Sequence, residues 1–252
     1  MIPVPLGKTD ANNSLPPDVI RQIHEIKVFF VENIRSAVRF LQWIEHPIPE
    51  YEIHFHILDK HTKAEDFADF GKILGKEPSG ILSEAGAPGV ADPGAKLVSM
   101  AHRRSVPVVP LVGPSSILLA LMASGLNGQQ FAFNGYLPID SRQREEHLRH
   151  LENKSAKNGS AQLFMEAPYR NKQVLDAATE FLKDDTELCI AGALTLENEW
   201  VRRYPISAWK SKKKDLPDNI PAIFAIQATV QERHPFQKSS QQKKTRNKKR
   251  RK

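Results

Sequence analysis

Cysteine and long apolar runs are both scarce in this sequence. Cys189 is the single cysteine among 252 residues, so no disulfide can form within the chain, which favours a reducing compartment. No apolar run approaches the roughly 20 residues that a membrane-spanning helix needs, and the N-terminus lacks the pattern of a signal peptide. We therefore expect a soluble, cytoplasmic protein that does not enter a membrane.

Acidic residues are absent from residues 238–252, which contain nine Lys or Arg residues. Without those nine charges the formal net charge of +7 becomes −2, so the rest of the chain is close to neutral. Because this segment also lacks apolar residues, we expect residues 236–252 to form a basic, disordered tail. Such a tail gains affinity for polyanions through counterion release, which agrees with RNA binding, although basic tails also occur as solvated extensions without a function.

Familiar nucleotide and metal motifs are also missing. The sequence contains neither the GxGxxG pattern nor the P-loop spacing. His54 and His56 flank Phe55 at strand spacing, but no cysteine or carboxylate completes a ligand set, so a solvated strand face is expected and no metal site is predicted.

Helical and strand-like apolar spacings alternate along the first part of the chain. We expect helices over residues 17–26, 35–44, 64–74 and 95–104, and strands over residues 1–6, 28–31, 55–58, 80–82 and 106–111. This alternation predicts an α/β fold with a largely parallel sheet and helical crossovers.

Gly113 and Pro114 interrupt this pattern, and we place a domain boundary at Val112. The prediction is an N-terminal α/β domain over residues 1–112 and a C-terminal α/β domain over residues 113–235. In the second domain we expect helices over residues 115–124, 142–153 and 171–183, and strands over residues 131–134, 162–165, 188–195, 199–204 and 222–228.

The segment ILSEAGAPGVADPG, residues 81–94, contains the most informative loop. A buried strand runs into three glycines, two prolines and two acids. Glycine leaves no Cβ to block a ligand, and proline fixes the turn. Open α/β sheets bind ligands at the carboxyl ends of their strands. Composition alone is equally compatible with a tight structural connection.

This loop, through SEAGAP at residues 83–88 and ADPG at residues 91–94, resembles the cofactor loop of the tetrapyrrole methylase superfamily. It is most similar to the branch of bacterial 16S ribosomal RNA 2′-O-ribose cytidine methyltransferases. Six further segments match in order, namely IPVPLG (2–7), VENIR (31–35), VVPLVGPSS (108–116), FNGYLP (133–138), FMEAPYR (164–170) and ALT (193–195).

The resemblance implies two α/β domains of the tetrapyrrole methylase type, a homodimer, and S-adenosylmethionine bound in the cleft between the domains. It also implies an RNA substrate, in particular ribosomal RNA. Transferred position by position, the cofactor contacts are Leu6, Gly7, Ser83, Glu84, Ala85, Gly86, Ala87, Ser115, Ser116, Met165, Ala193 and Leu194.

The sequence departs from the pattern of this branch in the loops expected to face cofactor or substrate. The branch usually has Asp at Glu84, Thr at Ala87, Asp-Thr at residues 33–34 and Arg-Glu at residues 192–193. Three functions therefore stay open. They are ribose methylation of RNA, methylation of a small tetrapyrrole-like molecule, and SAM or RNA binding by a paralogue with altered catalysis.

Glu32 and Arg35 are the candidate catalytic residues. Methyl transfer needs in-line alignment rather than a covalent protein intermediate, and a ribose hydroxyl benefits from a base or from a cation near the developing alkoxide. Glu32 would act as base or orienting group, and Arg35 as partner of a phosphate or alkoxide. The alternative is an ordinary ion pair between them. Asn134 and Tyr136, on either side of Gly135 and followed by Pro138, are candidates for a substrate wall, since aromatic side chains stack on RNA bases. The alternative for Tyr136 is a core residue.

We expect deletion of residues 238–252 to weaken RNA association and to flatten its dependence on salt, because nine positive charges are lost. The affinity for S-adenosylmethionine should not change. RNA binding titrations at several salt concentrations, with calorimetry of the cofactor as control, test this prediction. Equal losses of RNA and cofactor affinity would instead assign the tail a role in folding.

Overall fold

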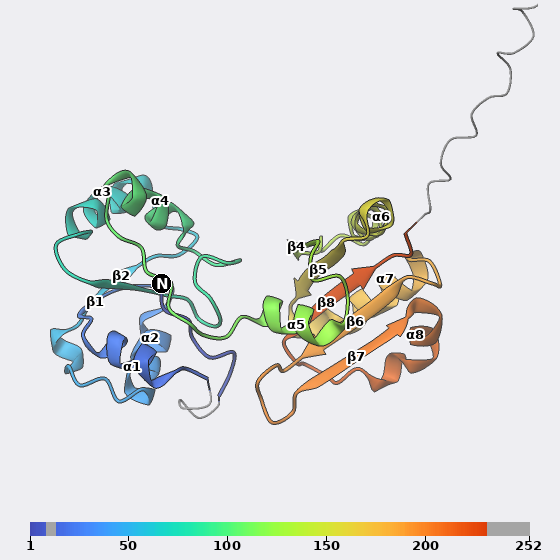
Figure 1. The fold of residues 1–252 in the computed structure, drawn as a ribbon, viewed down its shortest axis with the longest axis horizontal. Helices are drawn as coiled ribbons and strands as arrows, with labels where there is room; N and C mark the ends of the chain where they lie inside the picture. The colour runs from blue at the N-terminus through green and yellow to red at the C-terminus, as the bar shows by residue number, and fades with distance from the viewer. Residues whose placement is uncertain (9–13, 231–252) are drawn as a thin grey trace, which may run out of the picture.

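The chain forms two α/β halves that lie side by side (Figure 1). This architecture is seen in a computed structural model that describes residues 1–8 and 14–230. Each half contains one sheet, of three and of five strands. The basic tail expected over residues 236–252 lies outside the described residues. The strands of the two sheets fall on either side of Val112, although the boundary at this residue stays a prediction.

The N-terminal sheet is fully parallel, as predicted. Its central strand β1 (Val28–Val31) pairs with β2 (His54–Ile57) on one side and with β3 (Ser79–Leu82) on the other. All four residues of β1 are buried, which is expected for a parallel strand covered on both faces.

Helices cover the two faces of this sheet. Phe29 and Val31 share a core with α1 (Pro17–His24) and α2 (Ile34–Trp43). Val28 and Phe30 face the opposite way, toward α3 (Ala64–Ile73) and α4 (Ala95–Arg103). This arrangement follows from the two-residue repeat of a strand.

Residues 1–6 and 106–111 were predicted as strands. This prediction is wrong, because neither segment forms a regular strand. The first segment lies beside β3 and makes only isolated bridges, at Ile2 and Val4. The second lies beside the first, where Leu111 N donates to Met1 O over 3.0 Å. The segments contain prolines at positions 3, 5, 107 and 110. Because proline has no N–H group, a continuous ladder cannot form.

The C-terminal sheet has the order β4 (Phe131–Tyr136), β5 (Ala161–Glu166), β8 (Ala222–Gln227), β6 (Glu187–Gly192) and β7 (Trp200–Pro205). Only β4 and β5 are parallel, so the parallel pairing predicted for the first part of the chain does not extend to this half. The connection between β6 and β7, residues 193–199, is too short for the crossover that a parallel pair requires.

One face of this sheet is covered by α6 (Ser141–Asn158), α7 (Asn171–Phe181) and α8 (Ile206–Lys212). The seven-residue helix α8 was not predicted. It buries Ile206 and Trp209, and the Trp209 indole N–H donates to Leu188 O over 2.8 Å. The other face packs on α5 (Ser116–Ser124). Three short 3-10 helices complete the described elements, namely η2 (Glu50–Glu52), η3 (Pro168–Arg170) and η4 (Lys213–Asp215). Among the helices of the described residues, none has the length and apolar character needed to cross a membrane.

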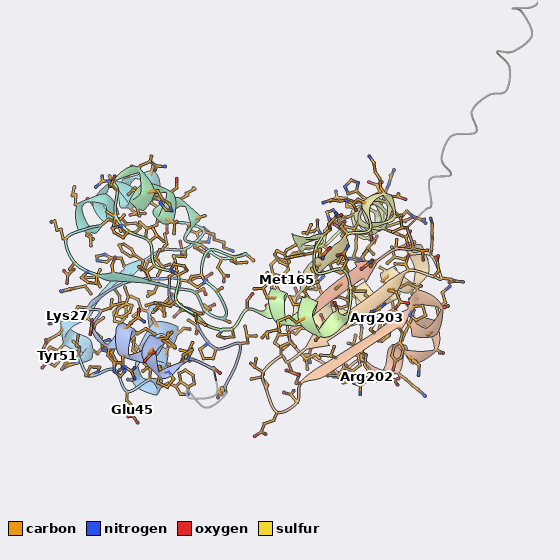
Figure 2. All side chains as sticks on the ribbon, in the orientation of Figure 1. Lys27, Glu45, Tyr51, Met165, Arg202 and Arg203 are labelled. Carbon is orange, nitrogen blue, oxygen red and sulfur yellow. The ribbon has the colours of Figure 1, made fainter. Side chains whose placement is uncertain are left out.

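Arg203 on β7 connects α5 to the sheet (Figure 2). Its Nη1 donates to Gly125 O over 2.8 Å and to Ser124 O over 3.3 Å, and its Nε donates to Glu187 Oε2 over 2.9 Å. A cation at the carboxyl end of a helix is favourable because the last carbonyls have no partner within the helix. Arg203 thereby fixes the position of α5 against the strands.

We expect Arg203→Met to lower the free energy of unfolding by about 1–2 kcal/mol, since these bonds involve a charged donor. Arg202→Met is the matched control, because Arg202 is exposed and stacks on the Trp200 ring. It should change the stability by roughly 0.5 kcal/mol or less. Urea denaturation followed by tryptophan fluorescence measures both variants, and equal losses would contradict a specific role for Arg203.

Candidate active site between the two halves

A cavity of about 500 Å³ is lined by residues of both halves. The N-terminal half contributes the carboxyl ends of its parallel strands. Glu32 directly follows β1, and the loop 83–94 follows β3. The C-terminal half contributes the start of α5, the ends of β4, β5 and β6, and the start of the antiparallel β8. The volume lies within the usual range of sites for small ligands.

Two backbone hydrogen bonds hold the glycine-rich loop in place. Val4 N donates to Gly86 O, and Gly86 N donates to Val4 O, both over 2.8 Å. Gly86 has φ +76°, a conformation that residues with a Cβ adopt only with strain. The pairing places Leu6 of the N-terminal segment beside the loop, where both line the cavity.

The floor of the cavity is small and apolar. Its side chains include seven alanines and the larger Leu6, Ile117, Met165, Leu194 and Ile223. Met165 lies on the side of the C-terminal half that faces the N-terminal half (Figure 2). Small side chains leave room for a flat ligand.

Ten of the twelve predicted cofactor contacts line the cavity, namely Leu6, Glu84, Ala85, Gly86, Ala87, Ser115, Ser116, Met165, Ala193 and Leu194. The structure does not place Gly7 and Ser83 in the lining. A Cβ at Gly7 would lie 2.8 Å from Leu196 Cδ1, so this glycine permits close packing. The Ser83 hydroxyl instead supports the loop, donating to Ala85 O over 3.3 Å.

The two candidate catalytic residues separate in the structure. Glu32 lines the cavity, whereas Arg35 is exposed in the first turn of α2 and is not part of the lining. The alternative of an ion pair between them is not what the structure shows, since among the described residues neither forms a salt bridge. The helix is instead capped by Asn33, whose Oδ1 accepts from Ser36 N over 3.2 Å.

Three carboxylates meet at the N-terminal wall, Glu32, Glu84 and Asp92. Burial, followed by repulsion from Asp92 and Glu84, raises the pKa of Glu32, although the Glu84 N–H donates to its carboxylate. Burial also raises the pKa of Asp92, as does Glu84, while a hydrogen bond from Ser83 opposes the rise. Ser36 Oγ holds Glu84 by donating to its Oε1 over 3.0 Å. Asp92 was not predicted as a site residue, and its place in the loop was the available signal.

The C-terminal wall contains a further acid, Glu166, which is 1% exposed at its side chain. Its Oε1 accepts from Ala167 N over 2.9 Å. Arg170 Nη2 lies 3.2 Å from Oε2, but this contact is ionic, because Oε2 has no hydrogen-bond partner in the described residues. The same Nη2 donates to Pro138 O over 3.1 Å. A buried oxygen with remaining acceptor capacity at the wall suits a polar ligand.

Tyr136 is not a core residue, since it is 60% exposed and lines the cavity. Burial of its hydroxyl, with the nearby charges of Asp92, Glu166 and Glu32, raises its pKa. The phenol therefore stays protonated and remains a hydrogen-bond donor in this acidic surrounding.

The histidines on β2 differ from each other. His54 is exposed, as predicted for a solvated face, but His56 is partly buried and packs 5.3 Å from the Phe30 ring centroid. Within the described part of the chain, no group of three or more His, Cys, Asp or Glu side chains could hold a metal ion.

Solved structures share this architecture. The methyltransferase CobJ superposes with a TM-score of 0.56 at 14% identity, covering 88% of this chain and 90% of CobJ. A conserved hypothetical protein from Aeropyrum pernix superposes with a TM-score of 0.61 at 15% identity, covering 90% and 84%. Identities this low establish the fold alone, which is the two-domain α/β fold of the tetrapyrrole methylase type.

Sequence comparison identifies the family more closely, although no family model matches the sequence. A relative named ribosomal RNA small subunit methyltransferase I, from Vibrio cholerae, is 30% identical over 207 residues, which are 82% of this chain and 68% of the relative. Relatives of the same name are 30% identical in Bacillus subtilis, over 82% of this chain and 67% of the relative, and 32% identical in Leptospira borgpetersenii, over 70% of each. The chain belongs to the ribosomal RNA small subunit methyltransferase I family.

One departure from the pattern of this branch has a visible structural counterpart. Gly192 and Ala193 stand where the branch usually has Arg-Glu, and in the structure the Ile220 side chain occupies the space where a Cβ at Gly192 would lie. A larger residue at position 192 would require Ile220 to move.

We expect Glu32→Gln to stabilise the protein at pH 8 but not at pH 4. The raised pKa means that ionisation of Glu32 is less favourable in the folded chain than in the unfolded chain. The resulting loss of stability is absent below the ordinary pKa of 4.5 and complete above the raised pKa. Thermal unfolding midpoints at both pH values test this prediction. Glu45→Gln, which alters an exposed acid far from the cavity (Figure 2), is the control, and a gain of equal size at both pH values would contradict it.

Proposed function

We propose that this protein transfers the methyl group of S-adenosylmethionine to a ribose 2′-hydroxyl of ribosomal RNA. The cavity enclosed by the glycine-rich loop and the C-terminal sheet is the observation that carries the proposal. The names of the relatives support an RNA substrate, since they are ribosomal RNA methyltransferases. A homodimer is part of the same proposal and can be measured by light scattering.

The residues of the cavity fit S-adenosylmethionine. The alanine-rich floor suits a flat adenosyl group, and Ala85, Gly86 and Ala87 of the glycine-rich loop line the cavity beside it. The carboxylates of Glu32, Glu84 and Asp92 suit the positive charges of a sulfonium and an amino group. When bound, the cofactor supplies an electrophilic methyl group.

Glu32 has the properties of a general base. Its carboxylate lines the cavity, and burial with neighbouring negative charge raises its pKa, which makes the carboxylate a stronger base. In the proposed reaction Glu32 accepts the proton of the ribose hydroxyl as that oxygen becomes a nucleophile. Glu84 and Asp92 act on Glu32 through charge. Arg35 remains a candidate partner of an RNA phosphate outside the cavity.

The decisive experiment measures labelled methyl transfer from S-adenosylmethionine to total RNA and to small ribosomal subunits of a strain that lacks this protein. Nucleoside mapping then identifies the modified atom. Transfer to ribose supports the proposal. Transfer to a small tetrapyrrole-like acceptor, or cofactor binding without any transfer to RNA, would overturn it in favour of the other two functions.

We expect Glu32→Gln to lower kcat by a factor of about 10²–10⁴, the usual contribution of a general base. The cofactor affinity should change by less than roughly tenfold. The rise of kcat with pH should disappear in this variant, because no carboxylate remains to be deprotonated. Glu45→Gln should retain the rate and the pH profile of the unmodified protein. Full activity of Glu32→Gln would assign the base to another residue.

A further inference from the structure

Two large, exposed side chains lie in the segments that continue from the cavity wall. Ile139 follows β4 and is 81% exposed, and Tyr169 in η3 follows β5 and is 74% exposed. Because β4 and β5 are parallel neighbours, with Tyr136 opposite Met165, the segments after them emerge at the same edge of the sheet. Tyr136, Glu166, Ala167 and Pro168 from these segments line the cavity. Ile139 and Tyr169 are not part of the lining, but they follow it within three residues, and we call these two residues the rim.

The backbone under these side chains is held by two arginines. Arg170 Nη2 donates to Pro138 O over 3.1 Å, and Arg144 Nη1 donates to Ile139 O over 2.9 Å. Arg170 is also in ionic contact with buried Glu166. The bond from Arg170 therefore joins the segment after β5 to the segment after β4, and the bond from Arg144 joins the latter to α6, so the backbone that carries Ile139 and Tyr169 is held in place. A ligand that binds such a surface loses little free energy to ordering it.

The charges of the site restrict what this rim can bind. The opposite wall contains Glu32, Glu84 and Asp92, which repel phosphate groups. Glu166 on the near side is compensated by Arg170. An RNA strand can therefore contact the rim through a nucleobase, which is uncharged, while its phosphates remain outside the cavity. Bases that are not paired stack on aromatic side chains in this way.

We propose that Tyr169, together with Ile139, forms a stacking platform for an unpaired nucleobase next to the methylated nucleotide. This inference rests on the proposed RNA methylation and adds the form of the substrate, a single-stranded segment. The Tyr169 ring supplies the stacking face, and Ile139 supplies an apolar contact beside it.

The test compares three variants, Tyr169→Ala, Tyr169→Phe and Tyr51→Ala. Tyr51 is a close match for Tyr169, since it is the central residue of the 3-10 helix η2 and is 85% exposed. It lies on the outer side of the N-terminal half, away from the C-terminal half (Figure 2). Affinities are measured for a single-stranded RNA oligonucleotide and for the same sequence in a duplex, each at several salt concentrations.

Tyr169→Ala should weaken binding of the single strand by about 5- to 150-fold, the effect of losing one stacked base. Tyr169→Phe should retain binding because the ring remains, and Tyr51→Ala should have no effect. The slope of affinity against salt should not change in Tyr169→Ala, since no phosphate contact is lost. The KM for small ribosomal subunits should rise in parallel, with an unchanged affinity for S-adenosylmethionine.

Unchanged RNA binding by Tyr169→Ala would overturn the platform, and so would an equal loss for single strand and duplex. If binding to naked RNA is unaffected but methylation of ribosomal subunits falls, the surface contacts a ribosomal protein, which also overturns it. Failure of the proposed function is distinguishable, because it appears as absence of methyl transfer by the unmodified protein. The binding titrations do not depend on that reaction.

Discussion

The pair of hydrogen bonds between Val4 and Gly86 is the constraint on which the site depends. The N-terminal segment contains prolines that prevent a regular strand, yet the N–H groups of Ile2 and Val4 still bond to β3 and to the loop after it. This pairing fixes a glycine with positive φ at the wall of the cavity. Without it, a loop rich in glycine and proline would have no defined position relative to Leu6 and α5.

Much of the fold could be predicted from local pattern. The buried run at residues 28–31 is the central strand, and the helices begin or end within a few residues of their expected bounds except α6, which is longer at its end. Long-range pairing could not be predicted in this way. Nothing in the local spacing of residues 222–228 indicates that this strand inserts between β5 and β6 in antiparallel orientation. A short helix held by one buried tryptophan was likewise invisible to periodicity.

The site was predictable mainly through its loop, because glycine, proline and acids within one segment mark a ligand contact. The outward position of Arg35 depends on where α2 begins, which Asn33 decides by capping it. The contribution of Asp92 depends on how the loop folds back toward Glu32. Repulsion among three neighbouring acids lowers the stability of the folded chain. The same repulsion raises the pKa of a carboxylate, which is what the chemistry of the cavity needs.

The central position of β8 also has a consequence for synthesis of the chain. The parallel pair β4 and β5 and the hairpin β6 and β7 are complete before residues 222–227 have left the ribosome, but no strand yet joins them. Both units expose an unpaired strand edge during this interval, which is a state prone to wrong pairing. Closure of the sheet, and with it the C-terminal wall formed by Ala222 and Ile223, is therefore among the last events of folding.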